Sequence, residues 1–184
     1  KKIGHINADI VFNIAEGISG RNRESQVPLI LEMQGIPFVG SDALTLGISL
    51  DKVMAKKILI SEGIPTPRFF EANDASDITA KITKGKFPLI VKPRSEGSSK
   101  GLSEKSRVET IDELRGQIGY ITKTYRQSAL VEEFIPGYEY TVAIIGNNAP
   151  EVLPPVQIKI DGELKLGDKF YTFTRTHSNR LEYV

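Results

Sequence analysis

The first part of the chain alternates apolar runs with a helical pattern. An apolar run at residues 9–14 is followed by a polar, glycine-rich stretch, and apolar side chains then recur three or four residues apart from Val27 onward. That spacing predicts a helix, for which Ser25 is a candidate N-cap and Gly35 a candidate end. A second apolar run follows at 36–39. Strand, helix and strand in this order predict a parallel α/β unit.

The next segment predicts a second helix and then a change of structure. Residues 49–62 carry one apolar face, the lysines of the segment lie mostly off it, and Gly63 can end the helix. Two prolines at 64–67 disfavour helix in the residues before them, so this segment is expected to be extended and to lead into a new domain. A strand near 68–71 and a short helix capped by Asp74 follow.

The remaining patterns predict four strands and one long helix. An apolar strand is expected at 87–93, and a capping box at 110–113 opens an apolar helical stripe. Apolar runs at 129–135 and 138–145 predict two strands with a Pro-Gly turn between them. The last strand of this series is expected at 157–160.

Composition excludes several classes of function. The 24 basic and 23 acidic side chains leave a net charge of only +1, which argues against a nucleic-acid-binding protein. The absence of cysteine excludes disulfides, thiolate zinc sites and a cysteine nucleophile. The apolar runs are far shorter than the roughly 20 residues that span a bilayer, and no signal-peptide pattern opens the chain. A cytoplasmic protein without membrane attachment is expected, cut at both ends because Lys1 and Val184 lie in mid-pattern.

The strongest candidate for chemistry is the end of the strand at 87–93. Its apolar run ends with Lys92, and a loop rich in glycine and serine follows at 94–101, called here the serine loop. A lysine there is costly without a partner, and glycine lets backbone amides converge on one point. A fixed ammonium and convergent amides suit a polyphosphate. A flexible hairpin with a solvated lysine is the alternative, and neither P-loop nor dinucleotide-binding spacing is present.

A second candidate is a group of carboxylates near the strand at 129–135. Glu132 and Glu133 interrupt its apolar run, and Glu139 follows six residues later. A strand edge with apolar neighbours suits a purine ring, and a carboxylate further along can accept from ribose hydroxyls. A hairpin with solvated glutamates is the alternative.

In their order and spacing these segments resemble the ATP-grasp superfamily and, in detail, the D-alanine–D-alanine ligase family. The resembling segments are 38–52, 63–67, the serine loop with its strand, and 130–139. The resemblance implies a mixed α/β (α+β) class and an ATP-grasp fold. It divides the chain into the remainder of an N-terminal α/β substrate domain, the central ATP-grasp subdomain and the start of an incomplete C-terminal subdomain, at 1–47, 48–130 and 131–184.

The resemblance implies ATP and small amino acids as ligands, with Mg²⁺ as a cofactor. Lys52 and Lys92 match the two lysines that contact ATP phosphates, and Ser98 and Ser99 match the loop that covers them. Ser98 also matches the serine that helps order the substrate site, which makes it the candidate catalytic residue. The resemblance further implies two carboxylates beside the adenine, a hinge whose backbone meets the purine, a ribose acid and two apolar neighbours. These are, in that order, Glu132 and Glu133, Phe134 and Ile135, Glu139, and Leu102 with Phe170.

The family activity implied is ATP-dependent joining of two D-alanines through an acylphosphate, for peptidoglycan precursor synthesis, with a homodimer as one arrangement. The family's magnesium ligands are expected beyond residue 184, so the isolated chain is expected to be inactive. Glu16-Gly17 replaces a usual His-Gly pair, and Thr176 and His177 replace a lysine and a tyrosine. These departures keep two alternatives open: a ligase for another amino acid or carboxylate, and a non-catalytic nucleotide-binding fragment.

Overall fold

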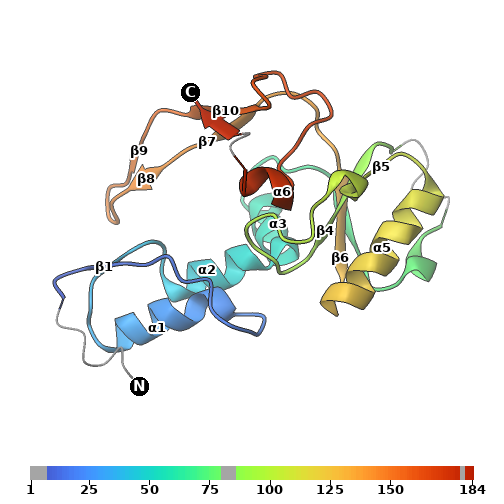
Figure 1. Cartoon of the computed structure of the whole chain (residues 1–184). Coiled ribbons are helices and arrows are strands. Elements are labelled where there is room, and N and C mark those ends of the chain that lie inside the picture. The colour runs from blue at the N-terminus through green and yellow to red at the C-terminus, as the bar shows by residue number, and fades with distance from the viewer. Residues whose placement is uncertain (1–7, 80–85, 179–180) are drawn as a thin grey trace.

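The computed structural model of the chain describes residues 8–79, 86–178 and 181–184 (Figure 1). Its first part is a small parallel α/β unit. Strands β1 (Val11–Phe12) and β2 (Phe38–Val39) pair in parallel, and helix α1 (Gln26–Met33) lies between them in the chain. The predicted order of strand, helix and strand is confirmed, although β1 is shorter than its apolar run.

The expected N-cap of α1 is wrong. Ser25 ends a short 3₁₀ turn, Arg23–Ser25, so its backbone is already helical and its side chain makes no capping hydrogen bond. An N-cap residue normally has extended backbone, which brings its side-chain oxygen within reach of the amides of the first turn. The buried Ser25 hydroxyl has no hydrogen-bond partner among the described residues.

The helix predicted at 49–62 is confirmed as α3 (Lys52–Ser61), but its first two residues belong to a preceding helix, α2 (Ala43–Leu50), that the pattern did not predict. The two helices meet at Asp51, whose extended backbone interrupts the helical path. The Asp51 carboxylate accepts the Met54 amide at 3.2 Å and so caps α3. Apolar spacing continues through the break, which is why periodicity alone placed the start of α3 too early, at Ser49.

The middle of the chain forms a four-stranded antiparallel sheet, called here the central sheet, in the order β3-β6-β4-β5. Helix α5 (Ile111–Tyr125) packs against it (Figure 1) and begins at the predicted capping box, in which Thr110 and Glu113 bond each other's amides. The strands expected in this region are confirmed, and so is the short helix capped by Asp74. The bounds are β3 (Phe69–Ala72), η3 (Ala75–Asp77), β4 (Leu89–Pro93), η4 (Glu104–Ser106), β5 (Arg107–Val108) and β6 (Ala129–Glu133).

Alternation along the strands gives this sheet two different faces. Leu89, Val91 and Val131 face α5 and are buried in the main apolar core. Because successive side chains point to opposite faces, Lys92 and Glu132 lie on the other face, where Glu132 contacts α3. One face of the sheet therefore closes a core and the other carries charged groups.

The C-terminal segment forms a second antiparallel sheet, in the order β11-β10-β7, and a separate pair, β8–β9. The strand expected at 138–145 is therefore divided between two sheets, whereas the strand expected at 157–160 is confirmed as β10. The bounds are β7 (Glu139–Thr141), β8 (Ile144–Ile145), β9 (Glu151–Val152), β10 (Val156–Ile160), α6 (Phe173–Thr176) and β11 (Leu181–Tyr183).

The expected boundaries between subdomains fall inside two elements. The boundary at 47/48 lies within α2 and the boundary at 130/131 lies within β6. The division into three parts stays a prediction. Among the described residues, no helix is long and apolar enough to cross a membrane.

Candidate functional site

A buried glutamate is shared by two lysines on the face of the central sheet opposite α5. Lys92 Nζ is ion-paired with Glu132 Oε1, and Lys56 Nζ lies 2.9 Å from Glu132 Oε2. The register places Ile90 opposite Glu132, so Lys92 lies diagonally across from Glu132 on the same face. Burial would raise the pKa of the Glu132 carboxyl, but Lys92 and Lys56 hold it below its ordinary value. The carboxylate therefore stays charged although it is almost completely buried.

Next to this ion pair, the serine loop covers a cavity of about 220 Å³. Burial lowers the pKa of Lys52, and the positive charge of Lys92 lowers it further. Two half-buried ammonium groups that repel one another are stabilised by an anion placed near both. The cavity is lined by Lys52, Lys92, Pro93, Glu96, Gly97, Ser98, Ser99, Lys100 and Leu102. The structure thus brings together the four residues expected to contact phosphates.

The tip of the serine loop has unusual backbone geometry. Ser98 and Ser99 have φ values of 49° and 55°, in the left-handed region. Such a conformation costs non-glycine residues on the order of 1–3 kcal/mol each and is concentrated at ligand-binding sites. Turn conformations of this kind also direct successive amides into one concavity, where they can bind an anion.

Polar contacts hold the first half of the serine loop in place. Lys52 Nζ donates to the Glu96 carbonyl, and Arg23 Nη1 donates to the Ser95 carbonyl at 2.7 Å. The Ser95 amide donates to Gln127 Oε1 at 2.6 Å. The loop is therefore anchored without apolar side chains, at the end that follows the strand.

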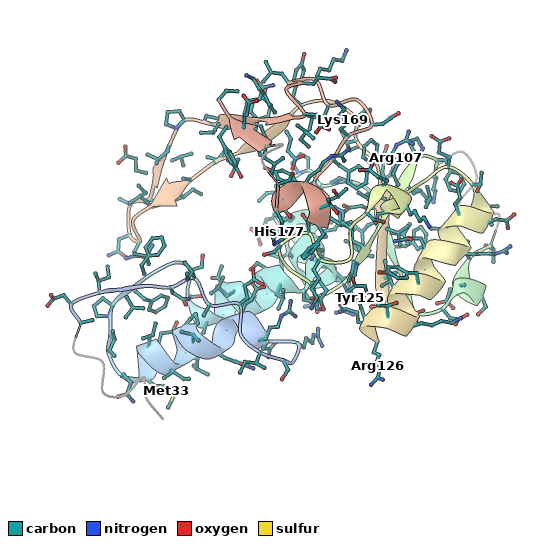
Figure 2. All side chains as sticks on the ribbon, in the orientation of Figure 1. Met33, Arg107, Tyr125, Arg126, Lys169 and His177 are labelled. Carbon is teal, nitrogen blue, oxygen red and sulfur yellow. The ribbon has the colours of Figure 1, made fainter. Side chains whose placement is uncertain are left out.

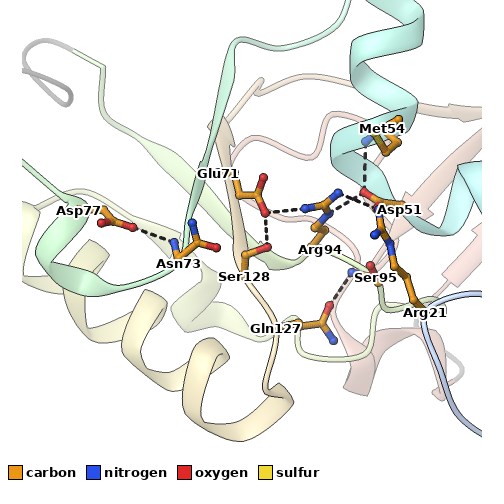
Figure 3. A network of polar contacts seen from close by, with 10 residues as sticks. All are labelled: Arg21, Asp51, Met54, Glu71, Asn73, Asp77, Arg94, Ser95, Gln127 and Ser128. Atoms are coloured by element: carbon orange, nitrogen blue, oxygen red, sulfur yellow. Dashed lines mark hydrogen bonds and ion pairs between the residues drawn. The ribbon is translucent and has the colours of Figure 1, made fainter.

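A second buried carboxylate, Asp51, joins the serine loop to α3 and to the N-terminal unit (Figure 3). Asp51 accepts hydrogen bonds from Arg94 Nε at 2.7 Å and from Arg21 Nη2 at 2.5 Å, besides the Met54 amide that it caps. Arg94 also donates to Glu71 on β3 at 2.7 Å. Burial would raise the pKa of Asp51, but these donors lower it to about 2.

An apolar cluster lies on the same face of the sheet as the lysines. It consists of Ile90, Phe134 and Phe170, with Leu102 packed against them. The rings of Phe134 and Phe170 meet edge-on with centroids 5.8 Å apart, and the Arg107 guanidinium lies 5.2 Å from the Phe134 centroid. Three residues expected near the adenine are thus neighbours, and sequence reasoning missed Ile90 and Arg107.

Three other expected residues lie apart from this cluster. Glu133 is on the opposite face from Glu132, and its carboxylate pairs with the exposed Arg68 at 3.0 Å. Ile135 is exposed. Glu139 is half-buried, and burial raises the pKa of its carboxyl while Lys92 opposes the rise. The contacts of these residues with a nucleotide stay predictions.

The departures from the family pattern fall in two places. Glu16 accepts a hydrogen bond from Ser98 Oγ, so a carboxylate stands against the tip of the serine loop. Thr176 and His177 lie at the end of α6 (Figure 2), where His177 Nδ1 is 2.8 Å from the Phe173 carbonyl and 3.0 Å from Thr176 Oγ1. The imidazole is therefore held against its own helix.

Lys56 and Asp51 are site residues that the sequence analysis did not single out. Lys56 was expected to lie off the apolar face of its helix but is 7% exposed. A signal was present, because Lys56 follows the buried Val53 by three residues and so shares its side of the helix. For Asp51 the signal was its frequent role as an N-cap.

A magnesium site does not fit the described residues. No group of three or more histidine, aspartate and glutamate side chains in 8–79, 86–178 and 181–184 is placed to hold a metal ion. Mg²⁺ prefers several oxygen ligands in octahedral array.

The two-faced sheet, the lysines under a serine loop and the adjoining apolar cluster define an ATP-grasp fold, the class of the solved structures that resemble this chain. The chain belongs to a particular family within it: the family model described as D-ala D-ala ligase C-terminus matches residues 58–183.

Individual relatives and solved structures match most of the chain. The chain is 41% identical to the uncharacterized protein y4sG of Sinorhizobium fredii over 82% of its own length and 43% of that protein. It is 33% identical to the D-alanine–D-alanine ligase of Natranaerobius thermophilus over 97% of its own length and 47% of that enzyme. A crystal structure of the D-alanine–D-alanine ligase of Bacillus anthracis complexed with ATP matches at 32% identity with a TM-score of 0.65, covering 84% of this chain and 49% of that one. The chain spans about half the length of these relatives.

Proposed function

We propose that the protein containing this chain is an ATP-dependent ligase that joins two D-alanines through an acylphosphate. Family membership supports this function, and so does the likeness to a D-alanine–D-alanine ligase complexed with ATP. The product would serve peptidoglycan precursor synthesis in the cytoplasm, where ATP is available. A homodimer remains an expectation that light scattering tests.

The observation that carries this function is the pair of neighbouring cations beneath the serine loop. Lys52 and Lys92 line one small cavity with Ser98 and Ser99, and the charge of Lys92 makes the Lys52 ammonium less stable. A triphosphate between the two lysines would relieve that repulsion, and the loop amides would add donors. The adjoining apolar cluster around Phe134 offers a surface of the kind that a purine ring needs.

In the proposed reaction, the carboxylate of the first amino acid attacks the γ-phosphorus of ATP and ADP leaves. The amine of the second amino acid then attacks the acyl carbon, and inorganic phosphate leaves. The chain's own contribution is to position the nucleotide and to neutralise charge on the transferring phosphoryl group, through Lys52, Lys92 and the serine-loop amides. Ser98 is assigned to the boundary between the nucleotide and the first substrate.

Phosphate release tests this function directly. The complete gene product that carries this chain is expected to release inorganic phosphate from ATP in proportion to dipeptide formed when D-alanine is supplied. L-Alanine is the matched control, because it differs only in configuration. Absence of D-alanine-dependent release, with the protein folded and Mg²⁺ present, would contradict the assignment.

A second function is favoured by Glu16. A carboxylate hydrogen-bonded to Ser98 changes the charge beside the expected substrate site, where the family usually has histidine. A ligase for a different amino acid or carboxylate would then be the outcome, since function is decided by the site rather than by the fold. Phosphate release across a panel of D- and L-amino acids separates the two: a preferred substrate other than D-alanine favours the second. Nucleotide binding without release for any panel member favours a non-catalytic fragment.

A further inference from the structure

Lys56 is a buried lysine with a complete set of partners on the nucleotide side of the sheet. Its Nζ lies 2.9 Å from Glu132 Oε2 and donates to Thr66 Oγ1 at 2.6 Å. The ammonium also lies 5.1 Å from the centroid of the Phe69 ring. Lys56 and Glu132 are each 7% exposed. A buried charge is tolerated at this cost only when it is paired and hydrogen-bonded, and Lys56 is both.

Lys92 shares the same carboxylate but is placed differently. It binds the other oxygen of Glu132, its side chain is 25% exposed, and it lines the cavity beneath the serine loop. Lys56 is not among the residues that line that cavity. Of the two lysines, Lys92 is therefore the one that can turn to a ligand there, and Lys56 is the one that stays with Glu132.

A change of partner by Lys92 has a cost that depends on Lys56. When Lys92 leaves Glu132 for a phosphate, the buried carboxylate loses one of its two counter-ions. Without Lys56, Glu132 would be an unpaired buried charge, which is strongly unfavourable. With Lys56 in place, the ion pair between Lys56 and Glu132 remains and still neutralises the buried carboxylate.

We infer that Lys56 is a positioning residue that acts as the resident counter-ion of Glu132, so that Lys92 is free to exchange this carboxylate for the triphosphate. The inference rests on the proposed nucleotide binding and extends it to a residue outside the cavity. Lys56 acts through Glu132 and Lys92 and does not touch the ligand.

The test measures tripolyphosphate binding by titration calorimetry on the complete gene product that carries this chain. Tripolyphosphate is the probe because it engages the lysines without adenine contacts. Lys56→Met is expected to weaken tripolyphosphate binding by about tenfold or more. Lys92 is then the only counter-ion of Glu132 and cannot leave it without exposing an unpaired buried charge. Lys56→Arg is expected to restore most of the affinity. Lys57→Met, at the exposed neighbouring position, is the matched control and should bind like the unaltered protein.

The decisive comparison repeats Lys56→Met in a Glu132→Gln background. There the carboxylate charge is gone, so Lys56→Met is expected to change affinity by less than about twofold. The double variant also avoids a buried carboxylate with a single counter-ion, which could unfold the single variant. Equal losses in both backgrounds would show a merely structural role and overturn the inference. Unchanged tripolyphosphate binding by a folded Lys56→Met variant would also overturn the inference, provided that the unaltered protein binds ATP. If the unaltered protein binds neither ATP nor tripolyphosphate, the proposed function fails as well.

Discussion

At the scale of single residues, the cations of the site already have partners before any ligand arrives. Lys92 is paired with Glu132, Lys52 donates to the Glu96 carbonyl, and Lys100 lies 3.4 Å from the Glu96 carboxylate. A nucleotide must therefore compete with these internal contacts, because the lysines are not unpaired before it binds. The effect of a lysine substitution on nucleotide affinity therefore also depends on whether the lysine's internal partner is left without a counter-ion.

The first prediction compares Lys92→Ala with Lys100→Ala. Lys92→Ala is expected to weaken ATP binding by a few kcal/mol, because a charge-assisted phosphate contact in a closed site is worth about that much. Lys100 is largely exposed and pairs with the Glu96 carboxylate at 3.4 Å, so Lys100→Ala should have a much smaller effect. Titration calorimetry with ATP on the complete gene product measures both. Equal losses would mean that Lys92 has no special phosphate contact.

The limits of sequence reasoning are clear at this scale. Residue types at the expected spacing indicated Lys52, Lys92, Ser98 and Ser99, and the structure places all four around one cavity. The sequence could not show which of Glu132 and Glu133 faces the lysines, because one residue of register decides which face a strand side chain occupies. Nor could it show the Lys56 partner, since Glu132 lies far along the chain and the pairing depends on the packing of α3.

At the scale of elements, helix and strand types were predicted better than their ends. The capping box at Thr110 gave the start of α5, because two reciprocal bonds are encoded within four neighbouring residues. The start of the helix expected at 49–62 was placed too early, because the apolar spacing persists through Asp51, where α2 ends and α3 begins. Asp51 bonds Arg21 and Arg94, and those tertiary contacts fix the break.

The second prediction concerns the end of the serine loop. Gly101 has φ of +85°, and a Cβ there would lie 2.4 Å from Pro93 Cγ and 3.2 Å from Tyr125 Cζ. Gly101→Ala is expected to destabilise the fold by roughly 1–3 kcal/mol, through backbone strain and overpacking. Gly116→Ala is the matched control on α5, where nothing lies within 4 Å of the added methyl group. It should be neutral or stabilising, by up to about 1 kcal/mol. Urea unfolding of the three proteins measures the difference, and equal stability of the two variants would contradict this account of the loop.

At the scale of the whole molecule, ion pairs of long sequence separation hold the N-terminal unit against the serine loop. Arg21 contacts Asp51 at the start of α3, and Arg23 contacts Glu96 in the loop after β4. From its sequence, the polar, glycine-rich stretch before Arg23 was predicted only to be a loop. Its contacts could not be predicted, because they join segments that neither periodicity nor capping relates.

The last prediction follows from the Asp51 carboxylate at the centre of this junction. Its pKa is lowered from 3.8 to about 2 in the folded protein, so Asp51 contributes stability above pH 3.8 that is lost as the pH falls toward about 2. A shift of that size corresponds to about 2 kcal/mol at neutral pH. Asp51→Asn keeps an N-cap for α3 but removes the charge that Arg21 and Arg94 share.

Asp51→Asn should therefore lower the free energy of unfolding by about 2 kcal/mol near pH 6, and the gap to the unaltered protein should narrow between pH 4 and pH 2. Asp42→Asn is the matched control, because Asp42 caps α2 through Thr45 at an exposed position. Its unfolding curve should stay close to that of the unaltered protein over the same range. Urea unfolding at several pH values measures these differences. A gap for Asp51→Asn that is independent of pH would show that the ion pairs of this carboxylate do not hold the junction together.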